Sequence, residues 1–144
     1  MSNKDELLSN ALGELGGIGS KWVAKFLPND AYELSLDIAI QSDSIITIST
    51  NVLSDNGKIL STESAFGITS IKGLTGSGFF NMNPTLVTIS IAEASPNQVR
   101  VLIQGIAKEG LIKQHAGKKA AQRIAQQLSA KLDELSRLAN RLKP

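Results

Sequence analysis

Residues Thr85–Ile106 read TLVTISIAEASPNQVRVLIQGI, and this stretch decides the fold. Its first half places an apolar side chain at every second position from Val87 to Ile91, and its second half does so from Val99 to Ile103. The residues between the halves, EASPN, are typical of a turn. Alternation on both sides of a turn predicts an antiparallel hairpin with one buried face. Because an isolated hairpin is unstable in water, we expect further strands and a cover for the apolar face.

The segment before this hairpin predicts two more strands. Lys58–Ser64 is a short strand candidate, and Phe66–Leu74 is a second in which the apolar residues alternate less well. Together with the hairpin they predict a four-stranded antiparallel meander over residues 57–106.

Residues 30–56 fit two patterns. Alternation from Tyr32 to Ile40 favours a strand, whereas apolar residues from Leu34 to Val52 share one face of a helix. Asp30 and Glu33 resemble a helix-capping box at the start, and the Asp-Asn-Gly at residues 55–57 is a plausible helix stop. Since both end signals match, we predict one helix over 30–56, with two strands as the alternative.

Residues 1–28 predict an N-terminal helical segment of one or two short helices, jointed at the glycines between Gly16 and Gly19. Pro28 ends it. The favoured role is packing, with Trp22 covering the sheet; the alternative is a helix lying in a membrane interface, because Trp, Phe and Lys mix here.

Residues 112–143 switch to helical spacing. Apolar positions from Ala121 to Leu142 step by four and three residues, which is the pattern of a coiled-coil seam. A helix of about 27 residues is ~40 Å long, whereas a sheet strand covers about 25–30 Å. We therefore expect the helix to extend past the sheet and to pair with a second copy of the chain. The predicted assembly seam is Leu128, Leu132, Leu135 and Leu142.

Composition bounds the class of protein. The 144 residues are 42% hydrophobic and 19% charged, which predicts one folded domain. There is no cysteine, no signal-peptide pattern and no run of about 20 apolar residues, so we expect a cytoplasmic protein. The separation of helical from strand patterns favours the α+β class, with the long C-terminal helix packed on the sheet and the N-terminal helices or a second subunit on its other face.

The segment between Gly73 and Pro84 is rich in glycine, but neither of the common phosphate-binding glycine motifs fits it. A bulge or a wide hairpin connection explains the glycines. Aromatic residues follow them, and loops carried by a rigid sheet often bind partners. The possible recognition loop is Gly76, Gly78, Phe79, Phe80 and Met82.

Candidate catalytic and metal-binding residues are scarce. His115 is the only histidine, no acid lies at ligand spacing from it, and the other acids are scattered or sit on helix surfaces. We predict no catalytic residue, no metal site and no cofactor, which favours a non-catalytic protein.

Eight of the 15 Lys and Arg residues, but only two of the 13 acids, follow residue 110. The possible anion-binding residues are Lys118, Lys119 and Arg123. Three functions remain open. The favoured one is a small interaction or assembly module that self-associates through its C-terminal helix and also offers the recognition loop to a protein partner. The others are a peripheral binder of nucleic acid or anionic membrane, and an enzyme or small-ligand carrier with a cavity between sheet and helix.

Overall fold

The computed structural model describes residues 22–27, 31–76, 85–107 and 116–142. Its centre is the predicted hairpin, formed by β5 (Thr85–Ser95) and β6 (Gln98–Ala107). The two strands are antiparallel, with Ile89 opposite Ile103, and both side chains are fully buried. The hairpin and its buried face are therefore confirmed.

The sheet has six strands in the order β1-β2-β6-β5-β4-β3, and all neighbours are antiparallel. The meander formed by β3 to β6 matches the prediction. The prediction of only four strands was wrong, because two earlier strands extend the sheet beyond β6. The strands outside the central hairpin are β1 (Val23–Leu27), β2 (Ala31–Ile38), β3 (Gly57–Ala65) and β4 (Ile68–Thr75).

The helix predicted over residues 30–56 is wrong for its first part. Residues 31–38 form β2, and the helix α2 (Ser42–Asn56) begins only after Gln41. The alternation was the correct signal, since Tyr32, Leu34 and Leu36 are all buried against the helices. Pairing with β6 provides the hydrogen-bond partners that the backbone of β2 needs. A helix over these residues would have formed its backbone hydrogen bonds internally. The predicted stop at Gly57 is confirmed.

The N-terminal helical segment predicted for residues 1–28 is also wrong where the structure describes it. Val23–Leu27 is β1, an edge strand that pairs with β2. The rest of the prediction, residues 1–21 and Pro28, lies outside the described residues. Trp22 does contribute to the core, as predicted: it is buried, and its Nε1 donates a 2.8 Å hydrogen bond to Ser129 Oγ on the last helix.

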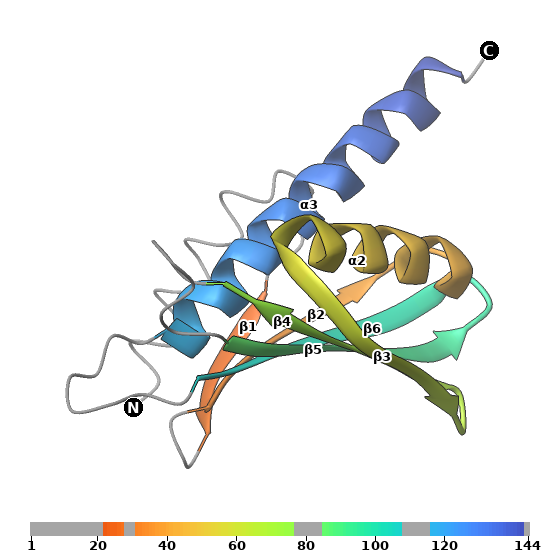
Figure 1. Ribbon diagram of the computed structural model, residues 1–144. Coiled ribbons are helices and arrows are strands. Elements are labelled where there is room, and N and C mark those ends of the chain that lie inside the picture. The colour runs from red at the N-terminus through yellow and green to blue at the C-terminus, as the bar shows by residue number, and fades with distance from the viewer. Residues whose placement is uncertain (1–21, 28–30, 77–84, 108–115, 143–144) are drawn as a thin grey trace.

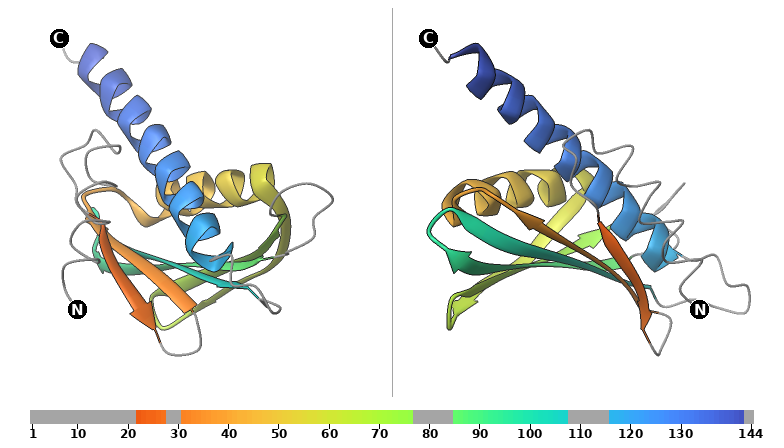
Figure 2. Two further views of the ribbon diagram at one scale, coloured as in Figure 1. Left: turned by 90° about the vertical axis from the view of Figure 1, so that its left-hand side faces the viewer. Right: turned by 180° about the vertical axis from the view of Figure 1, so that it is seen from behind.

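The last helix, α3 (Ala116–Arg141), confirms the predicted C-terminal helix. Figures 1 and 2 show both described helices on the same face of a strongly twisted sheet, with α3 running diagonally across it. α3 contacts β6, β2 and β5, and α2 contacts β3, β4 and β5. The core lies between these two layers and is built mainly from Leu, Ile, Val and Ala side chains.

Close backbone contact fixes the start of α3 on the sheet. Gly105 of β6 faces Gly117 of α3, and a Cβ atom added to either glycine would collide with the other's backbone. The pair of glycines therefore allows the first turn of α3 to rest directly on β6.

Candidate functional site

The far end of α3 leaves the body of the protein. Buried positions recur along the helix as far as Leu132, and every position from Glu134 to Leu142 is exposed. Figure 2 shows this end standing clear of the sheet and of α2. We call residues 133–142 the projecting segment.

The projecting segment carries three large apolar side chains that are partly or largely exposed. Leu135 is 43% exposed, Leu138 is 47% exposed and Leu142 is 83% exposed. Their spacing of three and four residues places them on one face of the helix. That face continues the buried stripe of Leu128 and Leu132, so the core-facing side of α3 extends past its own core.

An amide pair joins the two helices where they meet. Asn56 Nδ2 at the end of α2 donates a 2.6 Å hydrogen bond to Gln127 Oε1, and Gln127 Nε2 donates one of 3.3 Å to Asn56 Oδ1. Asn56 Nδ2 also donates to the Val52 carbonyl oxygen at 2.7 Å. These bonds fix α3 to α2 just before the projecting segment begins.

One cleft, which we call the first, lies between the base of the projecting segment and the connection from β2 to α2. Its volume is about 540 Å³, and Ile38, Ile40, Leu132 and Leu135 give it an apolar lining. Ile38 and Ile40 are only partly buried. The polar lining consists of Asp37, Ser44 and Ser136, and Ala39 completes it.

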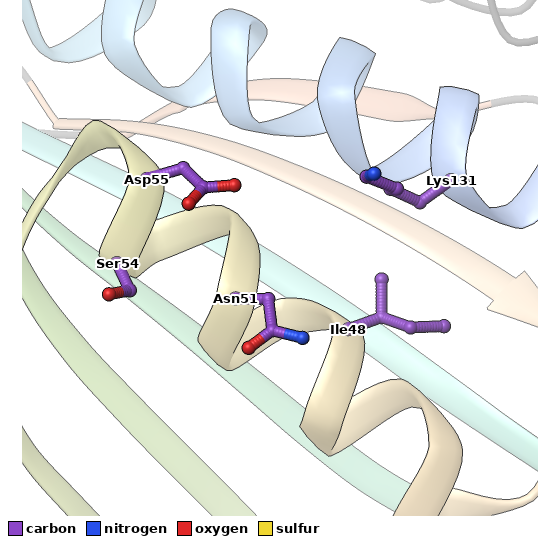
Figure 3. A pocket seen from close by; sticks show the side chains of 5 residues that line it. All are labelled: Ile48, Asn51, Ser54, Asp55 and Lys131. Carbon is purple, nitrogen blue, oxygen red and sulfur yellow. The ribbon is translucent and has the colours of Figure 1, made fainter.

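The second cleft, of about 310 Å³, lies between α2 and α3 (Figure 3). Ile48 of α2 points towards α3, and Lys131 borders the opposite wall. Asn51, Ser54 and Asp55 complete the lining from α2. Both clefts therefore open beside the residues at which α3 leaves the body.

Charge changes along the projecting segment. Asp133 and Glu134 stand at its base, whereas Arg137 and Arg141 stand nearer its tip. Arg137 Nη2 lies 3.1 Å from Asp133 Oδ2, one helical turn away. The segment thus has an acidic base and a basic tip on either side of its leucines.

A second ion pair borders the first cleft. Arg100 of β6 donates hydrogen bonds of 2.9 and 3.2 Å to the two carboxylate oxygens of Asp37 on β2. The hydrogen bond to Arg100 lowers the pKa of Asp37 below its usual value, so this carboxylate keeps its charge to a lower pH than an ordinary aspartate does. Both side chains are more than half exposed, which limits what the pair adds to stability.

The structure divides the predicted assembly seam in two. Leu128 and Leu132 are buried within the chain's own core, whereas Leu135 and Leu142 are exposed on the projecting segment. Leu138 was not among the predicted seam residues, because the predicted four-and-three steps run from Leu135 through Ala139 to Leu142. Its exposure and its place between Leu135 and Leu142 make it part of the candidate site.

The other predicted site residues are not near the projecting segment or lie outside the described chain. Lys118, Lys119 and Arg123 are on the first half of α3, where Lys119 and Arg123 are exposed. Of the possible recognition loop, only Gly76 is described; Gly78, Phe79, Phe80 and Met82 lie outside the described residues, as does His115.

An exposed aromatic residue, Phe66, has no signal in the sequence pattern. Phe66 was placed in a strand, but it sits at the tip of the β3–β4 hairpin with its side chain fully exposed. Its φ of 55° and the φ of 76° at Gly67 are the positive values of a tight two-residue turn.

Within the described part of the chain, no three His, Cys, Asp or Glu side chains gather as metal ligands would. Nor does either described helix have the length and apolar character needed to cross a bilayer. The exposed leucines of the projecting segment lie beside both clefts. Comparisons with known proteins place this chain in no family: no family model matches the sequence, and no curated protein is significantly similar to it.

Proposed function

We propose that this protein is a small assembly module that self-associates through the projecting segment of α3. The observation that carries the proposal is the continuation of the apolar face of α3 through Leu135, Leu138 and Leu142, beyond the last buried residue of the helix. Apolar surface that is exposed to water raises the free energy of the protein, and packing against a second helix would bury that surface.

A second copy of the chain is the occupant that the pattern favours. The three-and-four spacing of the leucines is that of helices packed side by side, and an identical helix brings the same spacing. Twofold pairing also places the same surface patch on both partners, so one exposed segment is sufficient to form the whole interface.

Sedimentation equilibrium at tens of micromolar tests this proposal. We expect the wild-type protein to be dimeric and Leu138→Glu to be monomeric. Removing one buried leucine from each copy costs about 1.5–3 kcal/mol per side chain, so the dimer should weaken by about 100-fold or more.

Leu60→Glu is the matched control. Leu60 is 50% exposed on β3, close to the 47% of Leu138, but it lies on the edge of the sheet and not on α3. We expect this variant to dimerise as the wild type does. A strictly monomeric wild type would contradict the proposal, as would a dimer that Leu60→Glu disrupts and Leu138→Glu leaves intact.

Anion binding is a second candidate, and one observation favours it. The part of α3 from Ala116 to Leu132 contains no acidic residue, while Lys119 and Arg123 are exposed one helical turn apart. Such a face suits a phosphate backbone or an anionic lipid surface. Retention on heparin at low salt that Lys119→Glu and Arg123→Glu reduce would support it, and no retention would rule it out.

A further inference from the structure

We propose that the two copies pair antiparallel through their projecting segments, with the tip of each segment lying beside the base of the other. This inference rests on the proposed self-association and specifies its geometry.

The leucines define the phase of the interface. Leu135 and Leu142 are seven residues apart and Leu138 lies between them, which are two a positions and one d position of a heptad. Glu134 and Arg141 each precede an a position, so both occupy g positions on the same flank of the exposed leucines. The residue at the e position between them is Ala139, which carries no charge.

Charge complementarity selects the direction. In an antiparallel pair the g flank of one helix faces the g flank of the other, so Glu134 meets the partner's Arg141 and the contact occurs twice by symmetry. In a parallel pair the g flank faces the uncharged e flank, and acidic base meets acidic base. Only the antiparallel arrangement brings the acidic base of one segment to the basic tip of the other.

The register follows from the leucine layers. With the twofold axis between residues 136 and 137, Leu135 packs against the partner's Leu138, and Leu138 packs against the partner's Leu135. The same register places the partner's Leu142 beside the aliphatic stem of Lys131.

The clefts at the base of the projecting segment lie where the last helical turn of the partner would pack. Lys131 borders the cleft that contains Ile48, and Leu135 borders the cleft that contains Ile38 and Ile40. An antiparallel partner ends beside these openings, so its Leu142 gains apolar neighbours from the body of the first copy. In a parallel pair this most exposed leucine meets only its own equivalent, far from both clefts.

Disulfide trapping tests the direction, because the chain has no cysteine of its own. We expect an equimolar mixture of Leu135→Cys and Leu138→Cys chains to form a disulfide-linked heterodimer on mild oxidation. Leu142→Cys alone should stay unlinked, since its two copies are about 11 residues or ~16 Å apart along the antiparallel pair. A disulfide requires Cα atoms within about 7 Å.

Two outcomes separate the direction from the association itself. Efficient linking of Leu142→Cys to itself, in a protein that sediments as a dimer, would overturn the antiparallel arrangement and leave self-association intact. A reduced wild type that sediments as a monomer would overturn both.

A charge exchange gives an independent test. Glu134→Arg places two arginines opposite each other at both symmetry-related contacts, and we expect the dimer to weaken by about fivefold or more. Adding Arg141→Glu restores the opposite charges and should return the dissociation constant to near that of the wild type. Glu63→Arg, an equal charge change on β3, is the control and should have no effect. If the double variant is as weak as Glu134→Arg alone, the antiparallel contact is wrong.

Discussion

At the scale of single residues, two serines with similar burial have opposite surroundings. Ser49 Oγ on α2 is fully buried and has no hydrogen-bond partner among the described residues, whereas Ser129 Oγ on α3 is buried and accepts the hydrogen bond from Trp22 Nε1. A buried hydroxyl without a partner costs free energy, and a paired one does not.

We therefore expect Ser49→Ala to raise the free energy of unfolding by about 1 kcal/mol, since it removes the unpaired oxygen and improves helix propensity. Ser129→Ala should lower it by about 1 kcal/mol, because Trp22 Nε1 loses this acceptor. Urea unfolding at one fixed protein concentration measures both. A loss of stability in Ser49→Ala would show that this hydroxyl has a partner in solution.

Phe66 has a backbone conformation that is unfavourable for its residue type. A side chain with a β-carbon is disfavoured at positive φ, by about 1–2 kcal/mol, and the exposed phenyl ring gains no packing in return. Two-residue hairpin turns with positive φ at both positions prefer Asn-Gly, and Gly67 already occupies the second position.

Phe66→Asn should therefore stabilise the protein by about 1 kcal/mol, measured as a shift of the urea midpoint with an unchanged slope. Ala65→Asn, one residue earlier in β3, is the control and should not stabilise. A less stable Phe66→Asn variant would mean that the ring makes contacts outside the described residues.

At the scale of elements, the sequence predicted the helices and strands whose apolar pattern fits only one kind of secondary structure. The central hairpin was predicted correctly because apolar residues alternate on both sides of its turn, and α3 because helical spacing continues from Ala121 to Leu142. Residues 31–38 were wrongly predicted as helical because strand β2 and helix α2 follow each other with only three residues between them. Leu34 and Ile38 fall by coincidence on the same helical face as the apolar residues of α2, and pairing between β2 and β6, which are 60 residues apart, leaves no local signal.

The contact between α3 and β6, which holds the helix in place, also has no sequence pattern that predicts it. Gly105 was read only as part of an alternating strand, yet an added Cβ there would collide with the Gly117 backbone. Gly105→Ala should push α3 away from β6 and destabilise the protein by about 1–3 kcal/mol. Gly67→Ala, in the exposed turn, provides a comparison in which strain comes from positive φ and not from packing.

Thermal unfolding with tryptophan fluorescence detects the difference between these two variants. Trp22 is packed against α3, so a displaced helix in Gly105→Ala should shift its emission in the folded state. Gly67→Ala should lower stability without that shift. An unshifted, fully stable Gly105→Ala variant would show that β6 and α3 separate at little cost.

At the scale of the whole molecule, only part of the candidate site could be predicted: Leu135 and Leu142 were among the predicted seam residues, whereas Leu138 was not. The comparison of the predicted helix length with the length of a sheet strand correctly indicated that α3 extends beyond the sheet. The boundary between buried and exposed leucines depends on the diagonal path of α3 and on the amide pair of Asn56 and Gln127, neither of which has a sequence pattern. The clefts are likewise products of tertiary packing, since their linings come from β2, α2 and α3 together.

If the projecting segment serves association and not folding, the two properties should separate when it is removed. A chain that ends at Ser136 retains every buried residue of α3 and the turn that follows Leu132, but it lacks Leu138 and Leu142. Because a dimer is stabilised by mass action, the Tm of the full chain should rise with protein concentration. The shortened chain should have a Tm that does not depend on concentration and that equals the full chain's value in dilute solution.

Differential scanning calorimetry over a 100-fold range of protein concentration distinguishes the full chain from the shortened one. A shortened chain that unfolds at lower temperature even when both proteins are dilute would instead show that the last turns of α3 stabilise their own subunit.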